Sequence, residues 1–148
     1  VGLRNPAHSL VKLMMPVAGN AVLVSSYTHP EYLHSMSATL ALTRTPALLL
    51  RGTEGEPVAD ARRTPAMDAF ASGVATRVQD AQAGPLAQLP DLPGTAPADT
   101  AAWIHRVLAG DAPVPPPIAQ QVAHIVALTR TAFASPAADA DTPQAHAV

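Results

Sequence analysis

Two short apolar runs, at residues 21–25 and 47–50, lie on either side of a segment with helical periodicity. Both runs are rich in aliphatic or β-branched residues, the pattern of strands buried inside a parallel sheet. Between them, residues 28–43 begin with Thr28, a good N-cap, and predict an amphipathic helix. The apolar residues on one face of this helix are Leu33, Met36 and Leu40. This order predicts an α/β fold, part of a domain with a mainly parallel sheet flanked by helices.

Other elements are predicted on both sides of this unit. Asn5 and Pro6 can start a short helix near residues 6–14. Residues 73–79 alternate apolar and polar side chains, which predicts a half-exposed strand. Residues 83–98 are rich in proline, glycine and alanine, which is typical of a surface loop.

Two helices are predicted in the last third of the chain. The first, at 98–109, should end at Gly110, a residue type that favours helix ends. Its expected buried residues are Trp103, Ile104 and Val107. The second follows a proline cluster at 113–117, and its expected apolar face comprises Ile118, Val122, Ile125 and Val126. We expect residues 1–133 to be the later part of an α/β domain and 134–148 to be a disordered tail, because the tail has little apolar surface to bury.

Composition narrows the compatible classes of protein. The absence of cysteine excludes disulfides, thiolate metal sites and cysteine nucleophiles, and no apolar run reaches the roughly 18 residues of a membrane span. We therefore expect a cytoplasmic protein without a membrane partner. The net charge of -2 lacks the basic excess of a typical nucleic-acid binder. Residues 1–63 nevertheless carry six basic side chains against four acidic ones, so an anion site is expected there.

The first candidate site lies in the opening segment. Arg4 and Asn5 precede a helix start, where free backbone N–H groups favour an anion, and His8 and Lys12 are four residues apart on one helical face. A carboxylate or phosphate would find several donors there. A capped surface helix with solvated side chains explains the same residues equally well.

The second candidate site is the turn at residues 25–32, which follows the first predicted strand. It carries hydroxyls, two tyrosines and His29, the residue most suited to ligand binding. Such a turn can bind phosphate at a helix N-terminus, and its aromatic side chains can stack on bases. Capping and packing at the edge of the core are the more common roles for these residues.

The third candidate site is the loop after the second predicted strand, at the carboxyl end where α/β sheets bind ligands. Its glycine-marked start comprises Gly52, Thr53, Glu54 and Gly55. Glu54 and Glu56 are candidate magnesium ligands, while Arg51, Arg62 and Arg63 are candidate phosphate contacts. Solvated charges and local ion pairs are the alternative interpretation.

These segments resemble the anthranilate phosphoribosyltransferase superfamily. Gly2-Leu3-Arg4 fits the Gly-x-Arg step of that family, and residues 51–55 fit its His-Gly-x-x-Gly loop, with Arg51 in place of histidine. The order of elements matches over roughly the first 80 residues and more loosely through the last helix. The resemblance implies a fold like that of nucleoside phosphorylases and phosphoribosyltransferases, with Arg4 in the substrate site.

The chain departs from the enzymes of this superfamily at functional positions. Residues 57–58 are Pro-Val where the enzymes carry an Asp-Glu metal pair, so that pair is lost or replaced by Glu56. His8 replaces an asparagine, and Lys12 replaces a proline. The sequences of three stretches are instead similar to those of the divergent branch described as DNA-binding or glycosyltransferase-like. They are residues 4–13, 27–32 and 50–57.

The resemblance implies partners as well as a fold. It implies sequence-independent nucleic-acid binding, with Lys12, Arg51, Arg62 and Arg63 on phosphates, and phosphoribosyl pyrophosphate as a further candidate ligand. The family's phosphate loop and helical dimerisation domain are expected upstream of Val1. We therefore expect a fragment or trimmed chain that forms a homodimer through an absent region and does not transfer phosphoribosyl groups alone.

Three functions stay open at this point. The leading one is nucleic-acid binding by a catalytically degenerate relative of the enzymes. The alternative is a magnesium-dependent phosphoribosyltransferase, in which Arg4 and His8 hold an aromatic acceptor, and Glu54 or Glu56 holds the metal. The third is a non-catalytic scaffold in which the loop stabilises the edge of the sheet.

Overall fold

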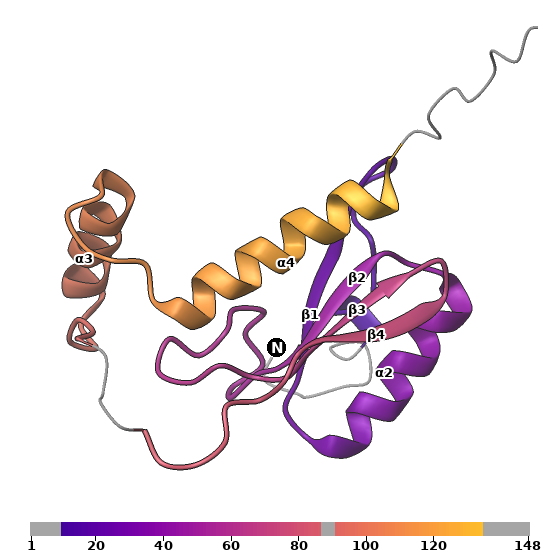
Figure 1. The fold of residues 1–148 in the computed structure, drawn as a ribbon, viewed down its shortest axis with the longest axis horizontal. Coiled ribbons are helices and arrows are strands. Elements are labelled where there is room, and N and C mark those ends of the chain that lie inside the picture. Colours follow the sequence, from indigo (N-terminus) through magenta and orange to yellow (C-terminus); the bar gives the residue numbers. More distant parts are fainter. Residues whose placement is uncertain (1–9, 87–90, 135–148) are drawn as a thin grey trace, which may run out of the picture.

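A four-stranded sheet forms the centre of the protein, shown by a computed structural model that describes residues 10–86 and 91–134 (Figure 1). The strands lie side by side in chain order. They are β1 (Leu23–Tyr27), β2 (Ala47–Arg51), β3 (Met67–Ala71) and β4 (Val74–Gln79). The α/β class is thereby confirmed.

The sheet is mixed, which corrects the expected mainly parallel arrangement. Only β1 and β2 are parallel, whereas β2–β3 and β3–β4 are antiparallel pairs. A parallel pair needs a crossover connection, and in this sheet only the β1–β2 connection contains a helix. Ser72 and Gly73 join β3 to β4 with φ values of 53° and 86°, as in a tight hairpin turn. Such a turn can connect only antiparallel strands.

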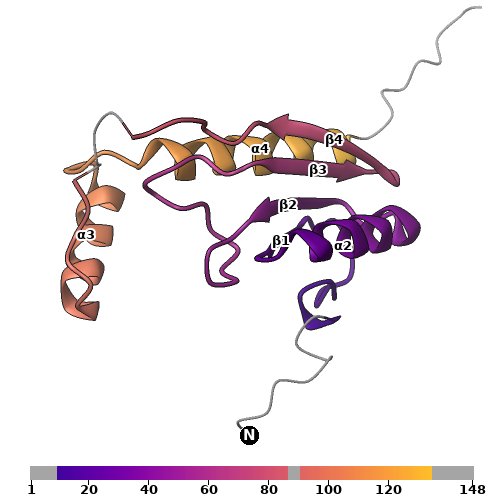
Figure 2. The same cartoon turned by 90° about the horizontal axis from the view of Figure 1, so that it is seen from below.

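Helices α2 (Pro30–Thr43) and α4 (Pro116–Ala132) cover the two faces of this sheet. A further helix is α3 (Pro97–Ala109). Figure 1 shows α2 and α4 on opposite sides of the sheet, and Figure 2 shows α3 standing away from the strands. In the described part of the chain, no helix combines the length and apolar character that crossing a membrane requires.

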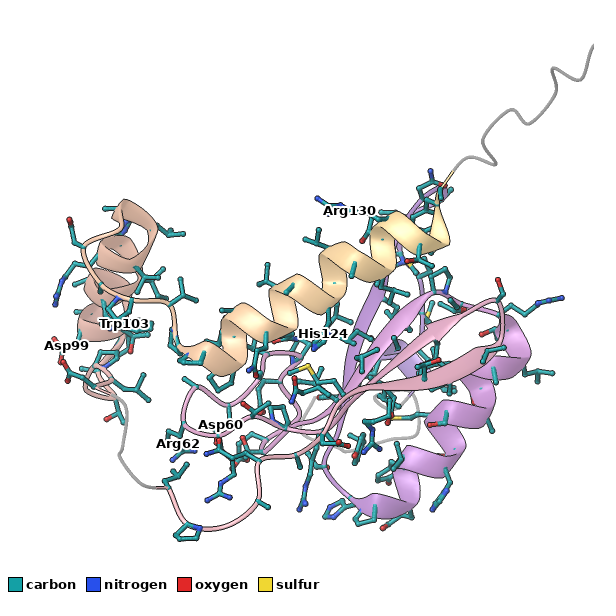
Figure 3. The ribbon with its side chains drawn as sticks, viewed as in Figure 1. Asp60, Arg62, Asp99, Trp103, His124 and Arg130 are labelled. Carbon is teal, nitrogen blue, oxygen red and sulfur yellow. The ribbon has the colours of Figure 1, made fainter. Side chains whose placement is uncertain are left out.

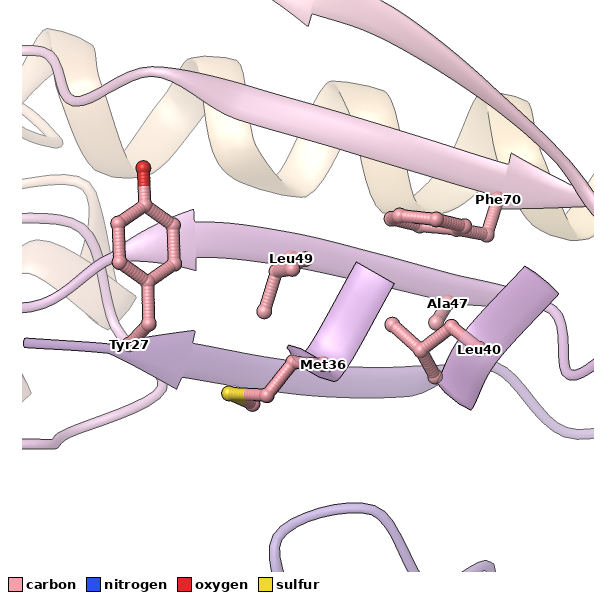
Figure 4. Packing of buried hydrophobic residues seen from close by; sticks show 6 residues of the cluster. All are labelled: Tyr27, Met36, Leu40, Ala47, Leu49 and Phe70. Carbon is pink, nitrogen blue, oxygen red and sulfur yellow. The ribbon is translucent and has the colours of Figure 1, made fainter. Parts of the chain in front are cut away.

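The core between α2 and the sheet confirms the predicted helical face. Met36 and Leu40 of α2 are buried against Tyr27, Leu49 and Phe70 of the strands (Figure 4). Leu33 is partly buried beside them. The helix begins after His29 rather than Thr28, and no side chain caps it. His29 precedes a proline, which favours its extended conformation (φ -108°, ψ 139°) and places the helix start at Pro30.

The core on the other face corrects the prediction for α4. The buried residues of this helix are Pro117, Gln121 and Leu128. Ile125 packs against the cluster as predicted, but Val122 and Val126 are 53% and 42% exposed. A buried glutamine therefore occupies the middle of the packed face, because its amide bonds to the loop below it.

Helix α3 also differs from the prediction. It ends at Gly110 as expected, with φ 84° at that residue, but it has no buried residue. Trp103 and Val107 are half-buried and Ile104 is 45% exposed. The reason is position, because α3 packs on neither face of the sheet (Figure 1).

The remaining predicted elements agree with the structure only in part. The first strand starts two residues later than predicted, at Leu23, and β4 forms where a strand at 73–79 was predicted. Its expected half-exposed alternation is wrong, because residues 74–77 are all exposed. Strand β3 was not predicted. The helix start at residue 6 and the tail at 135–148 lie outside the described residues.

Candidate functional site

The carboxyl ends of β1 and β2 carry the candidate site. The two strands are parallel and in register, so Tyr27 lies opposite Arg51 and both strands end at the same edge. The amide of Gly52 donates to the Tyr27 carbonyl (2.9 Å), which continues the pairing into the loop. Lys12 approaches this edge from the opening segment. Its Nζ donates to the carbonyls of Gly55 (3.1 Å) and Ser26 (3.4 Å).

Glycine is required at two places in this loop. At Gly52, a Cβ would lie 3.0 Å from the Glu56 carbonyl and 3.1 Å from the Ser26 side chain. Gly55 has φ +101°, and a Cβ there would lie 3.0 Å from Lys12 Nζ. The glycines therefore let the loop fold close to β1 and to the lysine.

Glu56 closes this loop on itself. Its carboxylate accepts hydrogen bonds from the Thr53 amide (2.8 Å), the Thr53 hydroxyl (2.9 Å) and the Glu54 amide (2.7 Å). Partial burial alone would raise the pKa of Glu56, but hydrogen bonds from backbone amides and the Thr53 hydroxyl outweigh it and lower the pKa to about 2. Both carboxylate oxygens thus stabilise the loop.

This low pKa makes a prediction for acid stability. A carboxyl group whose pKa is lower in the folded state stabilises the fold above its ordinary value of 4.5, and this stabilisation disappears as the pH falls toward 2. We expect Glu56→Gln to lower the urea midpoint at pH 7 and to leave it nearly unchanged near pH 2. Glu54→Gln, at an exposed neighbouring carboxylate, is the control. An equal loss for Glu56→Gln at both pH values would contradict this role.

Helix α4 holds the next part of the loop. The Gln121 side-chain amide accepts a hydrogen bond from the Ala59 N–H (2.8 Å) and donates one to the Pro57 carbonyl (2.8 Å). Gln121 is only 5% exposed. Thr64 donates to Gln120 of the same helix (3.1 Å). Gln121 was not among the predicted site residues. A polar residue at helical spacing between apolar positions was the signal that could have identified it.

The predicted arginines differ in their environments. Arg51 is exposed at the end of β2. Arg62 forms a two-point ion pair with Asp60, with both N–O distances 2.9 Å, and its side chain remains 57% exposed (Figure 3). Arg63 donates to the carbonyls of Gln82 (3.1 Å) and Gly84 (2.8 Å). Arg63 therefore fastens the chain that follows β4, whereas Arg51 and Arg62 keep exposed charge.

A second charged cluster lies along the neighbouring strands. Arg77 of β4 pairs with Asp68 of β3 (2.6 Å) and approaches Asp80 (3.6 Å). Burial, followed by the charge of Asp68, raises the pKa of Tyr27, while Arg77 and Arg51 act in the opposite direction. Tyr27 therefore stays a neutral part of the core beneath the site.

The structure brings together some of the predicted site residues. Lys12, Arg51 and the 52–55 loop meet at one edge, and His29 is exposed at the start of α2, two residues beyond β1. Arg4, Asn5 and His8 lie outside the described residues, so their place in an anion site stays a prediction.

The described residues offer no cluster of side chains for the predicted magnesium ion. Within 10–86 and 91–134, no group of three or more histidine, aspartate and glutamate side chains is placed to hold a metal ion. Glu54 is exposed, and Glu56 already binds three donors of its own loop. Magnesium binding stays a prediction.

Fold and site together define an α/β protein with a mixed sheet, whose glycine loop, half-buried Lys12 and exposed Arg51 gather at the carboxyl ends of the parallel strands. No protein-family model matches the sequence. The chain is similar to "Uncharacterized protein YbiB" of Escherichia coli (strain K12), with 39% identity over 127 residues. The matched region covers 83% of this chain and 38% of that protein. The chain thus spans well under half the length of this relative.

Proposed function

We propose that this chain binds the phosphate backbone of nucleic acid, without sequence preference, at the carboxyl ends of β1 and β2. The observation that carries the proposal is the meeting of Lys12 with the loop after β2, from a segment 43 residues away, beside exposed Arg51. Lysine and arginine contacts to phosphates supply affinity that does not depend on base sequence. The resemblance to the DNA-binding branch supports the same function.

The charges around this edge set the expected strength of binding. Lys12 donates to two carbonyls and has no carboxylate partner in those contacts, while Arg62 shares its charge with Asp60. Glu54 and Glu56 lie in the same loop. We therefore expect about three phosphate contacts, from Lys12, Arg51 and Arg62. Three contacts correspond to a slope of about -2 in log affinity against log salt for a single strand.

A salt series tests this function directly. We expect fluorescence anisotropy with a labelled single-stranded oligonucleotide to show that slope, and the double variant Lys12→Gln/Arg51→Gln to flatten it to about -0.7, the value for one remaining contact. The matched control is Arg106→Gln/Arg130→Gln, which removes two exposed charges, one from α3 and one from α4. Arg130 is labelled in Figure 3. Absence of binding at low salt, or an equal change in both variants, would refute the proposal.

Arg63 is a poor residue for this test. Its guanidinium bonds to the carbonyls of Gln82 and Gly84, so Arg63→Ala would disturb the chain after β4 as well as remove a charge. Lys12 Nζ also bonds to backbone carbonyls, those of Gly55 and Ser26, so the urea midpoint of Lys12→Gln/Arg51→Gln is compared with that of the original chain before its binding is measured.

The alternative function is a magnesium-dependent phosphoribosyltransferase, and it would use Glu54 or Glu56 as metal ligands. The hydrogen bonds of Glu56 favour a role in loop structure instead. If the alternative is correct, the chain binds phosphoribosyl pyrophosphate only with magnesium, and Glu56→Ala abolishes this binding while the variant stays folded. If the chain binds nucleic acid, its oligonucleotide affinity is salt-sensitive and needs no magnesium.

A further inference from the structure

Two exposed rings lie together at the start of α2. The centroids of the His29 and Tyr32 rings are 6.2 Å apart, with 44° between the ring planes. The Tyr32 amide donates to the His29 carbonyl (3.0 Å), which forms the turn that places both side chains on one side of the helix start. His29 is exposed, and Tyr32 is 43% exposed.

The exposure of Tyr32 on α2 contrasts with the burial of the aromatic residues of the strands. The chain has one tryptophan, two tyrosines and two phenylalanines. Tyr27 and Phe70 are 8% and 1% exposed, respectively, and both belong to the core. Burial of an aromatic side chain is strongly stabilising, so a chain with so few of them gives up part of that gain at Tyr32.

The ring pair is next to the proposed phosphate contacts. Lys12 donates to the Ser26 carbonyl, and only three peptide units separate Ser26 from His29, so their Cα atoms are at most about 11 Å apart. Arg51 lies opposite Tyr27, two residues before His29. A short stretch of oligonucleotide can therefore reach the cations and the rings together.

The charge at the start of α2 favours bases over phosphates at this position. Glu31 lies between the two rings in sequence, in the first turn of the helix, and its carboxylate repels an anion there. A base presents a flat aromatic face and carries no such charge. Phosphates therefore suit Lys12 and Arg51, and bases suit His29 and Tyr32.

We propose that the His29–Tyr32 pair stacks on the bases of a single-stranded nucleic acid whose phosphates contact Lys12 and Arg51. This inference rests on the proposed function and adds the kind of nucleic acid. Single strands can turn their bases outward onto aromatic side chains, and every base has a face that can stack. Duplexes keep these faces covered, so single strands bind more tightly than duplexes of equal length.

Binding of an intact and an abasic oligonucleotide of the same length separates stacking from phosphate contact. We expect Tyr32→Ala to weaken binding of the intact strand about tenfold, within the range for one stacked base. Affinity for the abasic strand and the salt slope should stay unchanged. Tyr32→Phe should bind like the original chain, because it keeps the ring. His29→Ala should weaken binding of the intact strand, whereas His34→Ala, at an exposed histidine of the same helix, is the matched control.

The outcomes distinguish this inference from the proposed function. Stacking is refuted if Tyr32→Ala binds each strand as tightly as the original chain does. It is also refuted if Tyr32→Ala loses affinity for the intact and the abasic strand to the same extent. Salt-sensitive binding of the abasic strand in that case still upholds phosphate contact. If the original chain binds neither strand at low salt, both proposals fall. A selective loss for the intact strand, rescued by Tyr32→Phe, establishes stacking.

Discussion

Replacing Phe70 with alanine is expected to lower the free energy of unfolding by about 3–5 kcal/mol, the range for removing a buried aromatic ring. Phe70 of β3 is 1% exposed and belongs to the same buried cluster as Leu40 of α2 and Ala47 of β2 (Figure 4). Its loss leaves a cavity between the antiparallel half of the sheet and the helix. Urea denaturation followed by far-UV circular dichroism measures the change.

The hairpin offers a matched control for this substitution. Val74 of β4 is 65% exposed, so Val74→Ala removes little buried surface and should change the unfolding free energy by less than about 1 kcal/mol. Total stabilities of domains are about 5–15 kcal/mol, so Phe70→Ala can come close to unfolding the chain. Similar small effects of both substitutions would show that Phe70 is not a core residue.

Gln121→Met should give the second large effect, a loss of about 2–4 kcal/mol. The substitution keeps the length of the side chain but removes both hydrogen bonds to the loop, leaving the Ala59 N–H and Pro57 carbonyl without partners. The buried Ala59 N–H costs about 1–3 kcal/mol when unpaired, and the loss of the part-buried bond to the Pro57 carbonyl adds about 1 kcal/mol. Denaturation measures the total, and hydrogen exchange at the Ala59 amide reports local opening of the loop.

The neighbouring glutamine separates this role from general effects on α4. Gln120 is exposed and accepts one hydrogen bond, from Thr64, so Gln120→Met should cost about 1 kcal/mol or less. Faster exchange at Ala59 is expected only in Gln121→Met. Unchanged exchange in that variant would mean that α4 does not hold the loop.

Together these contacts explain how the proposed phosphate site keeps its shape. Lys12 bonds to one end of the loop at Gly55, Glu56 closes the turn, and Gln121 holds residues 57–59. The three contacts come from segments far apart in the sequence. A loop fixed in this way presents Arg51 from a constant position, which reduces the entropy lost on binding.

Local patterns predicted much of the framework. The runs at 21–25 and 47–50 correspond to β1 and β2, and the helical spacing of Leu33, Met36 and Leu40 identified the packed face of α2. The glycine loop was predicted from residues directly after a buried strand. These patterns are local because a strand or helix sets which of its own residues share a face.

The errors arose where a contact between distant segments decides burial. Met67–Ala71 lacks a strong strand pattern, and it forms β3 because β2 and β4 supply its hydrogen-bonding partners. Val122 was expected in the core, but Gln121 takes the buried position because the loop offers it an N–H and a carbonyl. Propensity alone does not predict such an exchange.

The sequence by itself determined the α/β class, the parallel pair with its crossover helix, and the position of a glycine loop with cations near it. The tertiary structure decided which partner each basic side chain contacts. It placed Lys12 on the loop, paired Arg62 with Asp60, and set Arg63 on backbone carbonyls. The physical reason is that periodicity depends on residues a few positions apart, whereas hydrogen bonds and ion pairs depend on which distant segments the fold brings within about 3 Å.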